Sequence, residues 1–225
     1  MGKTAFIWDL DGTLLDSYAI IVSSLHQTYR EFGLELDKRE INKELITFSL
    51  GVYLAKIEKE KEISSGPVKE RFSEINNSRA LDTKRISHAS EILTYLQKRN
   101  IPNYVFTHKG STTIPVLQNL NLYDYFEEIV TGKDGFPKKP DPAALNYLIQ
   151  KHGLDKNKTF YVGDRTLDVA CANNAGIKSI LYLPEDSYAI SNGKETYIVK
   201  DLLDIRNIVE SLQKKDSPRL ETSEE

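Results

Sequence analysis

Near its amino terminus the chain reads Phe6-Ile7-Trp8-Asp9-Leu10-Asp11-Gly12-Thr13-Leu14-Leu15-Asp16-Ser17. This pattern predicts a short apolar strand that ends in two carboxylates and a Gly-Thr turn. Because residues i and i+2 of an extended backbone point to the same side, we expect the side chains of Asp9 and Asp11 to converge. Two anions at the end of an apolar strand are costly unless a cation or a proton compensates them. The pattern therefore indicates a metal site or an acid/base pair, although Asp-Gly is also a common turn sequence.

Three further polar clusters follow strand-like runs, at residues 104–110, 135–142 and 160–168. Their chemically useful side chains include a hydroxyl, an ammonium and two carboxylates: Thr107, Lys139, Asp164 and Asp168. In an open parallel sheet, ligands bind beyond the carboxyl ends of the strands. The sequence therefore predicts one crevice in which these groups meet the acids of the first strand.

Strand and helix patterns alternate from about residue 83 onward. One expected strand ends at Thr107, and the later ones cover residues 128–131, 159–162, 179–183 and 197–199. Helical patterns separate these strands, and a last helix is expected near residues 202–212. Alternating units of this kind predict an α/β fold, with a Rossmann-like, doubly wound parallel sheet that is covered by helices on both faces.

No strand pattern is found between Ser17 and Asp82, where apolar residues recur at helical spacing in four segments. Gly33 is placed to end the first helix, Asp37 to cap the second and Pro67 to begin the fourth. We therefore expect a small all-helical domain, which occupies residues 17–82 and is inserted into a catalytic core of residues 1–16 and 83–212. The charged end, residues 213–225, is expected to be disordered.

The composition narrows the class of protein. A formal charge of -3 gives no electrostatic indication of binding to nucleic acid or to an anionic membrane. The single cysteine, Cys171, excludes an internal disulfide and suits a reducing compartment. No signal peptide or membrane span is recognised, so a soluble cytoplasmic protein is expected. Nothing in the sequence indicates an oligomeric state.

Four motifs in order carry a family resemblance: Asp-x-Asp-Gly-Thr at residues 9–13, Thr107, Lys-Pro-Asp-Pro at 139–142 and Gly-Asp-x-x-x-Asp at 163–168. This set resembles the haloacid dehalogenase-like hydrolase superfamily, and more closely its phosphoglycolate phosphatase and phosphoglucomutase-like branch. The resemblance extends from about Lys3 to about Leu183. It implies a helical cap at the position of the predicted insertion.

The resemblance also implies catalytic roles. Asp9 would be the nucleophile that forms an aspartyl-phosphate, and Asp11 would protonate the leaving alcohol and later accept a proton from water. Mg²⁺ would be held by the Asp9 carboxylate, the backbone carbonyl of Asp11 and the Asp164 carboxylate. Asp168 would lie in a second shell and orient waters or Lys139. Lys139 would stabilise the nucleophile and the phosphate.

The phosphate would also be bound by the hydroxyl of Thr107 and the backbone amide of His108. The family often has asparagine at position 108, so the His108 side chain is expected either to contact substrate or to face solvent. In residues 48–52, Gly51 is expected to be the hinge of a substrate-specificity loop, or merely to separate two helices. Arg165 replaces the serine that commonly follows the family's Gly-Asp, and the resemblance gives it no role.

The resulting prediction is a Mg²⁺-dependent phosphatase that acts on a small phosphorylated metabolite and resembles phosphoglycolate phosphatase. The alternative is a phosphosugar mutase of the same branch, which returns the phosphoryl group to a sugar. A phosphoacceptor module of receiver type and a non-catalytic binding protein are less favoured. A dehalogenase is disfavoured, because that branch has no acid at the position of Asp11. The identity of the phosphorylated substrate stays open.

Overall fold

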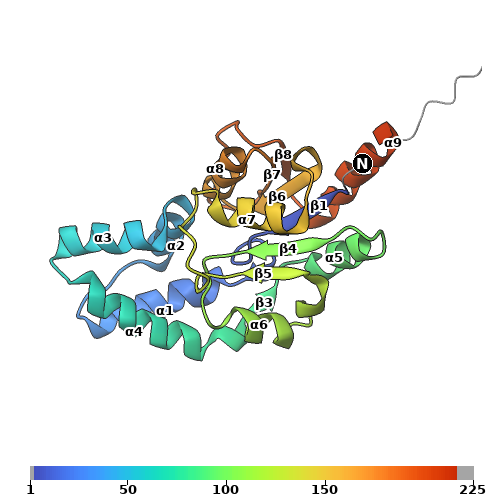
Figure 1. Cartoon of the computed structure of the whole chain (residues 1–225). Helices are drawn as coiled ribbons and strands as arrows, with labels where there is room; N and C mark the ends of the chain where they lie inside the picture. The colour runs from blue at the N-terminus through green and yellow to red at the C-terminus, as the bar shows by residue number, and fades with distance from the viewer. Residues whose placement is uncertain (1–2, 217–225) are drawn as a thin grey trace, which may run out of the picture.

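The computed structural model describes residues 3–216 and has an α/β fold built on a parallel sheet (Figure 1). Six strands form this sheet in the order β5-β4-β1-β6-β7-β8. Their bounds are β1 Ala5–Trp8, β4 Asn103–Phe106, β5 Glu128–Val130, β6 Thr159–Gly163, β7 Lys178–Tyr182 and β8 Tyr197–Val199. The predicted fold class is confirmed, and each predicted strand is present within one or two residues of its expected ends.

Helices cover both faces of the sheet because the buried strands are apolar on both sides. In β1, Phe6 and Trp8 pack into one hydrophobic core, whereas Ala5 and Ile7 pack into the other. The first core is completed by α5 Ala89–Gln97, α6 Thr113–Asn119 and α9 Ile205–Asp216. The second core is completed by α7 Ala143–His152 and α8 Thr166–Ala175.

The strand order places a topological switch point beside β1. From β1 the chain moves to β4 and β5 on one side, then crosses back to β6, β7 and β8 on the other. β1 therefore pairs with β4 through Phe6–Asn103 and with β6 through Trp8–Val162. Ligands of doubly wound sheets bind outside the carboxyl ends of the strands at such a point. The segments that follow β1, β4 and β6 are thus brought together.

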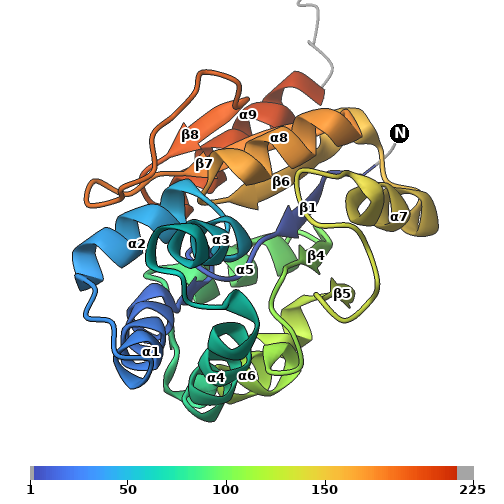
Figure 2. The same ribbon diagram turned by 90° about the vertical axis from the view of Figure 1, so that its left-hand side faces the viewer.

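Four helices form the insertion between β1 and the rest of the core: α1 Tyr18–Glu31, α2 Lys38–Thr47, α3 Leu50–Lys61 and α4 Ser65–Ser78. They share a hydrophobic core of their own and lie beyond the carboxyl ends of the strands (Figures 1 and 2). Asp37 caps α2 by accepting hydrogen bonds from two backbone amides, and Gly33 follows α1 with a φ of +76°. The four predicted helices are confirmed.

A short antiparallel pair, β2 Leu15–Asp16 and β3 Lys84–Arg85, was not predicted. It lies where the chain leaves the core for the insertion and where it returns. Strands of two residues are too short to produce a recognisable alternation of apolar and polar residues.

The predicted disorder of residues 213–225 is wrong at its start, because α9 continues to Asp216. Buried Ile208 and Val209 and half-buried Leu212 keep the helical spacing, and charged residues on a solvated face do not end a helix. Residues 217–225 lie outside the described part of the chain.

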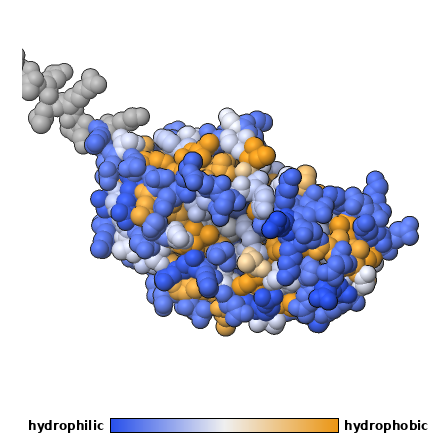
Figure 3. Space-filling view, turned by 180° about the vertical axis from the view of Figure 1, so that it is seen from behind, coloured by the Kyte–Doolittle hydropathy of each residue, from blue (hydrophilic) through white to orange (hydrophobic). Residues whose placement is uncertain are grey.

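The surface of the described chain is mostly polar. Figure 3 shows hydrophilic residues over most of the face seen from behind, with hydrophobic residues in scattered groups. Among residues 3–216, no helix combines the length and the apolar composition required to cross a membrane.

Candidate active site

Three buried carboxylates meet beyond the ends of β1 and β6. Asp9 directly follows β1, Asp164 directly follows β6, and Asp168 lies in the first turn of α8. One oxygen of each lies within 4.8 Å of the others. We call Asp9, Asp164 and Asp168 the acid cluster. The Asp11 carboxylate is not part of it and is more exposed, at 25% against 5% for Asp9.

Lys139 provides a buried cation to the acid cluster from a distant part of the sequence. It lies in the loop between β5 and α7, and its Nζ is 2.9 Å from Asp9 Oδ1 and 2.9 Å from Asp168 Oδ1. Burial opposes the charged form of each group, yet the attraction between them lowers the pKa of Asp168 and raises the pKa of Lys139. The ammonium is therefore a fixed positive charge beside Asp9.

Asp164 has polar partners but forms no ion pair within residues 3–216. Its Oδ1 accepts a hydrogen bond from Thr13 Oγ1 at 3.2 Å, and its Oδ2 accepts one from the Tyr18 hydroxyl at 2.9 Å. Burial raises the pKa of Asp164 to about 7, and nearby Asp168 adds to the shift. Burial also raises the pKa of Asp9. Two carboxylates that resist ionisation indicate that the cluster lacks positive charge.

A divalent cation fits this deficit and the chemistry of the donors. Carboxylate oxygens are ligands that Mg²⁺ prefers, and the acid cluster offers several of them in one small volume. Asp164 accepts only from two hydroxyl groups, so its oxygens keep lone pairs for such an ion, whereas Asp168 is held by the Lys139 ammonium at 2.9 Å and by the backbone N–H of Arg165 at 3.2 Å. The donor set therefore fits the predicted metal.

Gly12 allows the backbone to pass close to the acid cluster. Its φ is +84°, and a Cβ at this position would lie 2.5 Å from Asp164 Oδ2 and would also overlap the Tyr18 ring.

We expect Gly12→Ala to lower the free energy of unfolding by about 2–4 kcal/mol, because it adds a steric clash to backbone strain. Gly135→Ala is the matched control, since Gly135 has a φ of +77° but no atom within 4 Å of the place that a Cβ would take. Urea unfolding measures the free energy of unfolding of both variants. Equal decreases in the two would contradict the close packing at Gly12.

Asp11 forms an ion pair with Lys109, a residue that the sequence analysis missed. Lys109 Nζ lies 3.0 Å from Asp11 Oδ1, and the Lys109 backbone N–H donates to Thr107 Oγ1 at 3.1 Å. Thr107 is buried and follows β4. Its position in the sequence could have identified Lys109, because it lies two residues after Thr107, at the end of a strand that faces the site.

His108 is half-buried, and its Nε2 is not free to contact a ligand. That atom accepts a hydrogen bond from the backbone N–H of Lys139 at 2.9 Å, and the ring packs edge-on against Phe106. Burial lowers the pKa of His108 to about 4, and the charges of Lys139 and Arg165 lower it as well. The neutral imidazole thus anchors the loop that carries Lys139.

This contact predicts a pH-dependent contribution to stability. The pKa of His108 is lowered from 6.5 to about 4, so between these pH values the unfolded chain binds a proton that the folded ring does not. The stability of the wild type relative to His108→Asn should therefore fall as the pH decreases through this window, by roughly 2 kcal/mol for a partly exposed ring. Urea unfolding of both proteins at several pH values measures the difference. A difference that does not change with pH would argue against the buried, neutral imidazole.

The remaining predicted residue, Gly51, lies in the first turn of α3, after Ser49, whose Oγ accepts the N–H of Val52. It is exposed, and its proposed role in a specificity loop stays a prediction.

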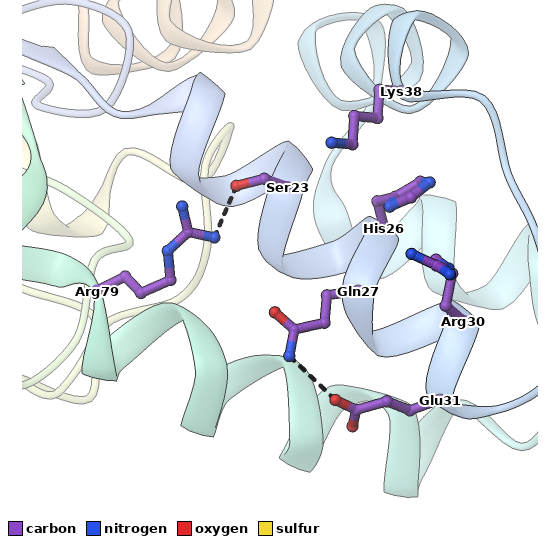
Figure 4. A pocket seen from close by; sticks show the side chains of 7 residues that line it. All are labelled: Ser23, His26, Gln27, Arg30, Glu31, Lys38 and Arg79. Atoms are coloured by element: carbon purple, nitrogen blue, oxygen red, sulfur yellow. Dashed lines mark hydrogen bonds between the residues drawn. The ribbon is translucent and has the colours of Figure 1, made fainter.

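A hollow of about 600 Å³ lies elsewhere, on the helical insertion (Figure 4). It is lined by Ser23, His26, Gln27, Arg30, Glu31, Lys38 and Arg79. Figure 4 shows the hydrogen bond from Arg79 to Ser23 and the one from Gln27 to Glu31, which lie one turn apart on α1. The hollow shares no residue with the acid cluster.

The chain is similar to known proteins over most of its length. The sequence profile described as haloacid dehalogenase-like hydrolase matches residues 6–182. Pyrophosphatase PpaX of Oceanobacillus iheyensis is 27% identical over 214 residues, which cover 93% of this chain and 98% of that protein. A phosphoglycolate phosphatase of Vibrio vulnificus is 29% identical over 215 residues, which cover 90% and 94%. The crystal structure of a predicted phosphoglycolate phosphatase from Haemophilus somnus has a TM-score of 0.80 at 22% identity, and the match covers 92% and 98%.

The chain belongs to the haloacid dehalogenase-like hydrolase family, whose profile matches most of its length. The predictions of this family and of an enzyme are therefore confirmed. The solved structure, at 22% identity, supports the fold alone.

Proposed function

We propose that the protein is a Mg²⁺-dependent phosphatase, which hydrolyses a small phosphorylated metabolite through an aspartyl-phosphate on Asp9. The observation that carries this proposal is the buried contact of 2.9 Å between Asp9 Oδ1 and Lys139 Nζ within the acid cluster. A carboxylate that approaches a phosphate dianion is repelled by about 4 kcal/mol per charge pair at ~4 Å and an effective dielectric constant near 20. A fixed ammonium at the nucleophile offsets part of this repulsion.

In the proposed first step, a carboxylate oxygen of Asp9 attacks phosphorus in line with the leaving oxygen. The new bond joins Asp9 to phosphorus, the bond to the alcohol oxygen breaks, and Asp11 gives that oxygen a proton. In the second step Asp11 takes a proton from water, whose oxygen attacks phosphorus. The Asp9–phosphorus bond then breaks, which releases inorganic phosphate and restores the Asp9 carboxylate.

The other residues hold these groups in place. Thr107 is buried beside Lys109, and we assign its hydroxyl and the backbone amide of His108 to the phosphoryl oxygens. Lys109 positions the Asp11 carboxylate through their ion pair of 3.0 Å. Mg²⁺, held by Asp9, Asp164 and the backbone carbonyl of Asp11, would supply positive charge to the phosphoryl group.

We further propose that residues 17–82 form a cap over this site and that the core comprises residues 1–16 and 83–212. The four helices have their own hydrophobic core, and the first residue of α1, Tyr18, donates a hydrogen bond to Asp164. A cap that opens and closes would exclude bulk water during the first step and admit it for the second.

Hydrolysis is favoured over mutase activity by the names of the relatives, a pyrophosphatase and a phosphoglycolate phosphatase. A non-catalytic protein is disfavoured, because all the residues of the four motifs are present and several meet in one buried site. No observation favours the phosphosugar mutase.

Removal of metal tests the proposal. Treatment with a chelator should lower the release of phosphate by at least about 10²-fold, because the acid cluster then lacks the charge that offsets the phosphate dianion. Added Mg²⁺ should restore it. The substrates should include phosphoglycolate, pyrophosphate and a hexose 1-phosphate with a bisphosphate primer. Full activity in the chelator would contradict the metal, and conversion of the hexose phosphate without release of phosphate would identify a mutase.

A further inference from the structure

The guanidinium of Arg165 lies beside the acid cluster but is bonded to none of the three carboxylates. The residue joins β6 to α8 in an extended conformation, with a φ of -127° and a ψ of 154°. Its backbone N–H binds Asp168, but its side chain forms no hydrogen bond or ion pair within residues 3–216. The Nε atom is fully buried and has no partner. A buried donor without a partner is costly, so this arrangement calls for an explanation.

The side chain of Arg165 nevertheless begins within the acid cluster, because the residue directly follows Asp164 and its backbone N–H donates to Asp168 Oδ2 at 3.2 Å. Burial opposes its charge, but Tyr18 and the carboxylates of the acid cluster raise the pKa of Arg165. In turn, the charge of Arg165 lowers the pKa of His108. The side chain is therefore a permanent cation inside the site, since guanidinium does not lose its proton in proteins.

Each carboxylate of the site has a bonded partner other than the Arg165 side chain. Asp9 and Asp168 share Lys139, and Asp164 accepts hydrogen bonds from Thr13 and Tyr18. The other acid of the site, Asp11, is compensated by Lys109. The fork of Arg165 is thus available to a ligand, and its planar donors match the oxygens of a carboxylate or a phosphoryl group.

The balance of charge shows what Arg165 contributes to the site. The three carboxylates of the acid cluster exceed Lys139 and Arg165 by one negative charge. The divalent cation of the proposed function would turn this into one positive charge. Without the charge of Arg165 the sum would be zero. Arg165 therefore decides whether the site with its cation carries a net positive charge, which favours an anionic ligand.

We propose that Arg165 binds a second anionic group of the substrate, a carboxylate or a second phosphoryl group next to the one that is transferred. This inference rests on the proposed phosphatase function. Lys139 already lies on the nucleophile, whereas Arg165 directly follows Asp164, whose carboxylate accepts a hydrogen bond from Tyr18 at the start of the helical insertion. The Arg165 side chain thus begins at the end of β6 that the helical insertion meets.

The test compares specificity ratios in the full-length, Mg²⁺-loaded enzyme. One ratio is kcat/KM for phosphoglycolate over kcat/KM for 2-hydroxyethyl phosphate, which has the same length but no carboxylate. In Arg165→Ser this ratio should fall about 10- to 100-fold, the effect expected for one charge-assisted hydrogen bond. Arg165→Lys should give an intermediate ratio, because it keeps the charge and loses the fork. Lys138→Ser is the matched control, since it removes an equal charge from an exposed side chain nearby and should leave the ratio within about twofold.

A second arm, with pyrophosphate, distinguishes the two kinds of anionic group. The larger loss of kcat/KM in Arg165→Ser, for phosphoglycolate or for pyrophosphate, identifies the group that Arg165 binds. An unchanged ratio, or equal losses for the two acidic substrates and the neutral one, would overturn the inference. Wild-type enzyme that hydrolyses 2-hydroxyethyl phosphate as well as phosphoglycolate would overturn it too and leave the phosphatase function standing. Wild-type enzyme that hydrolyses none of the three would instead refute the proposed function. Thermal unfolding of each variant identifies any loss that arises from misfolding.

Discussion

Asp9→Asn should lower kcat/KM for phosphate release by about 10⁴-fold or more, because the amide has no free anionic oxygen to attack phosphorus. The fold should persist. Burial raises the pKa of Asp9, so the ionised form is itself costly, and an amide oxygen still accepts a hydrogen bond from Lys139. We expect the free energy of unfolding to change by less than about 1 kcal/mol.

Steady-state kinetics and urea unfolding of the same preparation check both parts of this prediction. Asp16→Asn is the matched control, because Asp16 is an exposed acid near the same motif. It should retain activity within about twofold. Near-normal turnover in Asp9→Asn would mean that another group attacks phosphorus.

Lys139→Met should reduce both stability and activity. The substitution leaves the carboxylates of Asp9 and Asp168 buried without the ammonium that now lies 2.9 Å from each. Removal of one partner from a buried ionic group costs about 3–5 kcal/mol, so the metal-free protein should lose that much free energy of unfolding. Bound Mg²⁺ should recover part of the loss, because it supplies positive charge to the same carboxylates. Activity should fall about 10²- to 10³-fold with the loss of a fixed charge at the nucleophile.

The control for Lys139→Met is Lys138→Met, at the adjacent exposed lysine. It should change stability by less than about 0.5 kcal/mol. If Lys138→Met causes the larger loss of activity, the motif has been assigned to the wrong lysine.

The sequence predicted the residues that meet but not their individual contacts. Asp9, Asp164 and Lys139 were identified because each follows an apolar strand or a recognisable motif, and the parallel sheet brings those ends together. The hydrogen bond from Tyr18 to Asp164 was not predictable in this way, because it depends on how the helical insertion packs against the core.

Two side chains have bonding partners that the sequence pattern did not predict. His108 was expected to reach substrate or solvent, but its Nε2 binds the backbone of Lys139, a contact between residues separated by 31 positions. Asp11 was expected to converge with Asp9, but its carboxylate turns to Lys109. Spacing along a strand predicts the side to which a residue points, whereas the final partner depends on charges contributed by other segments.

Capture of the covalent intermediate tests the central claim most directly. In Asp11→Asn, 4-nitrophenyl phosphate should still phosphorylate the enzyme, since nitrophenolate leaves without a proton, whereas attack by water is slowed. After an acid quench with substrate labelled in the phosphoryl group, we predict label on the peptide that contains Asp9, at the Asp9 carboxylate. Label on a different residue, or nitrophenol and labelled phosphate released together while the protein stays unlabelled, would contradict the account.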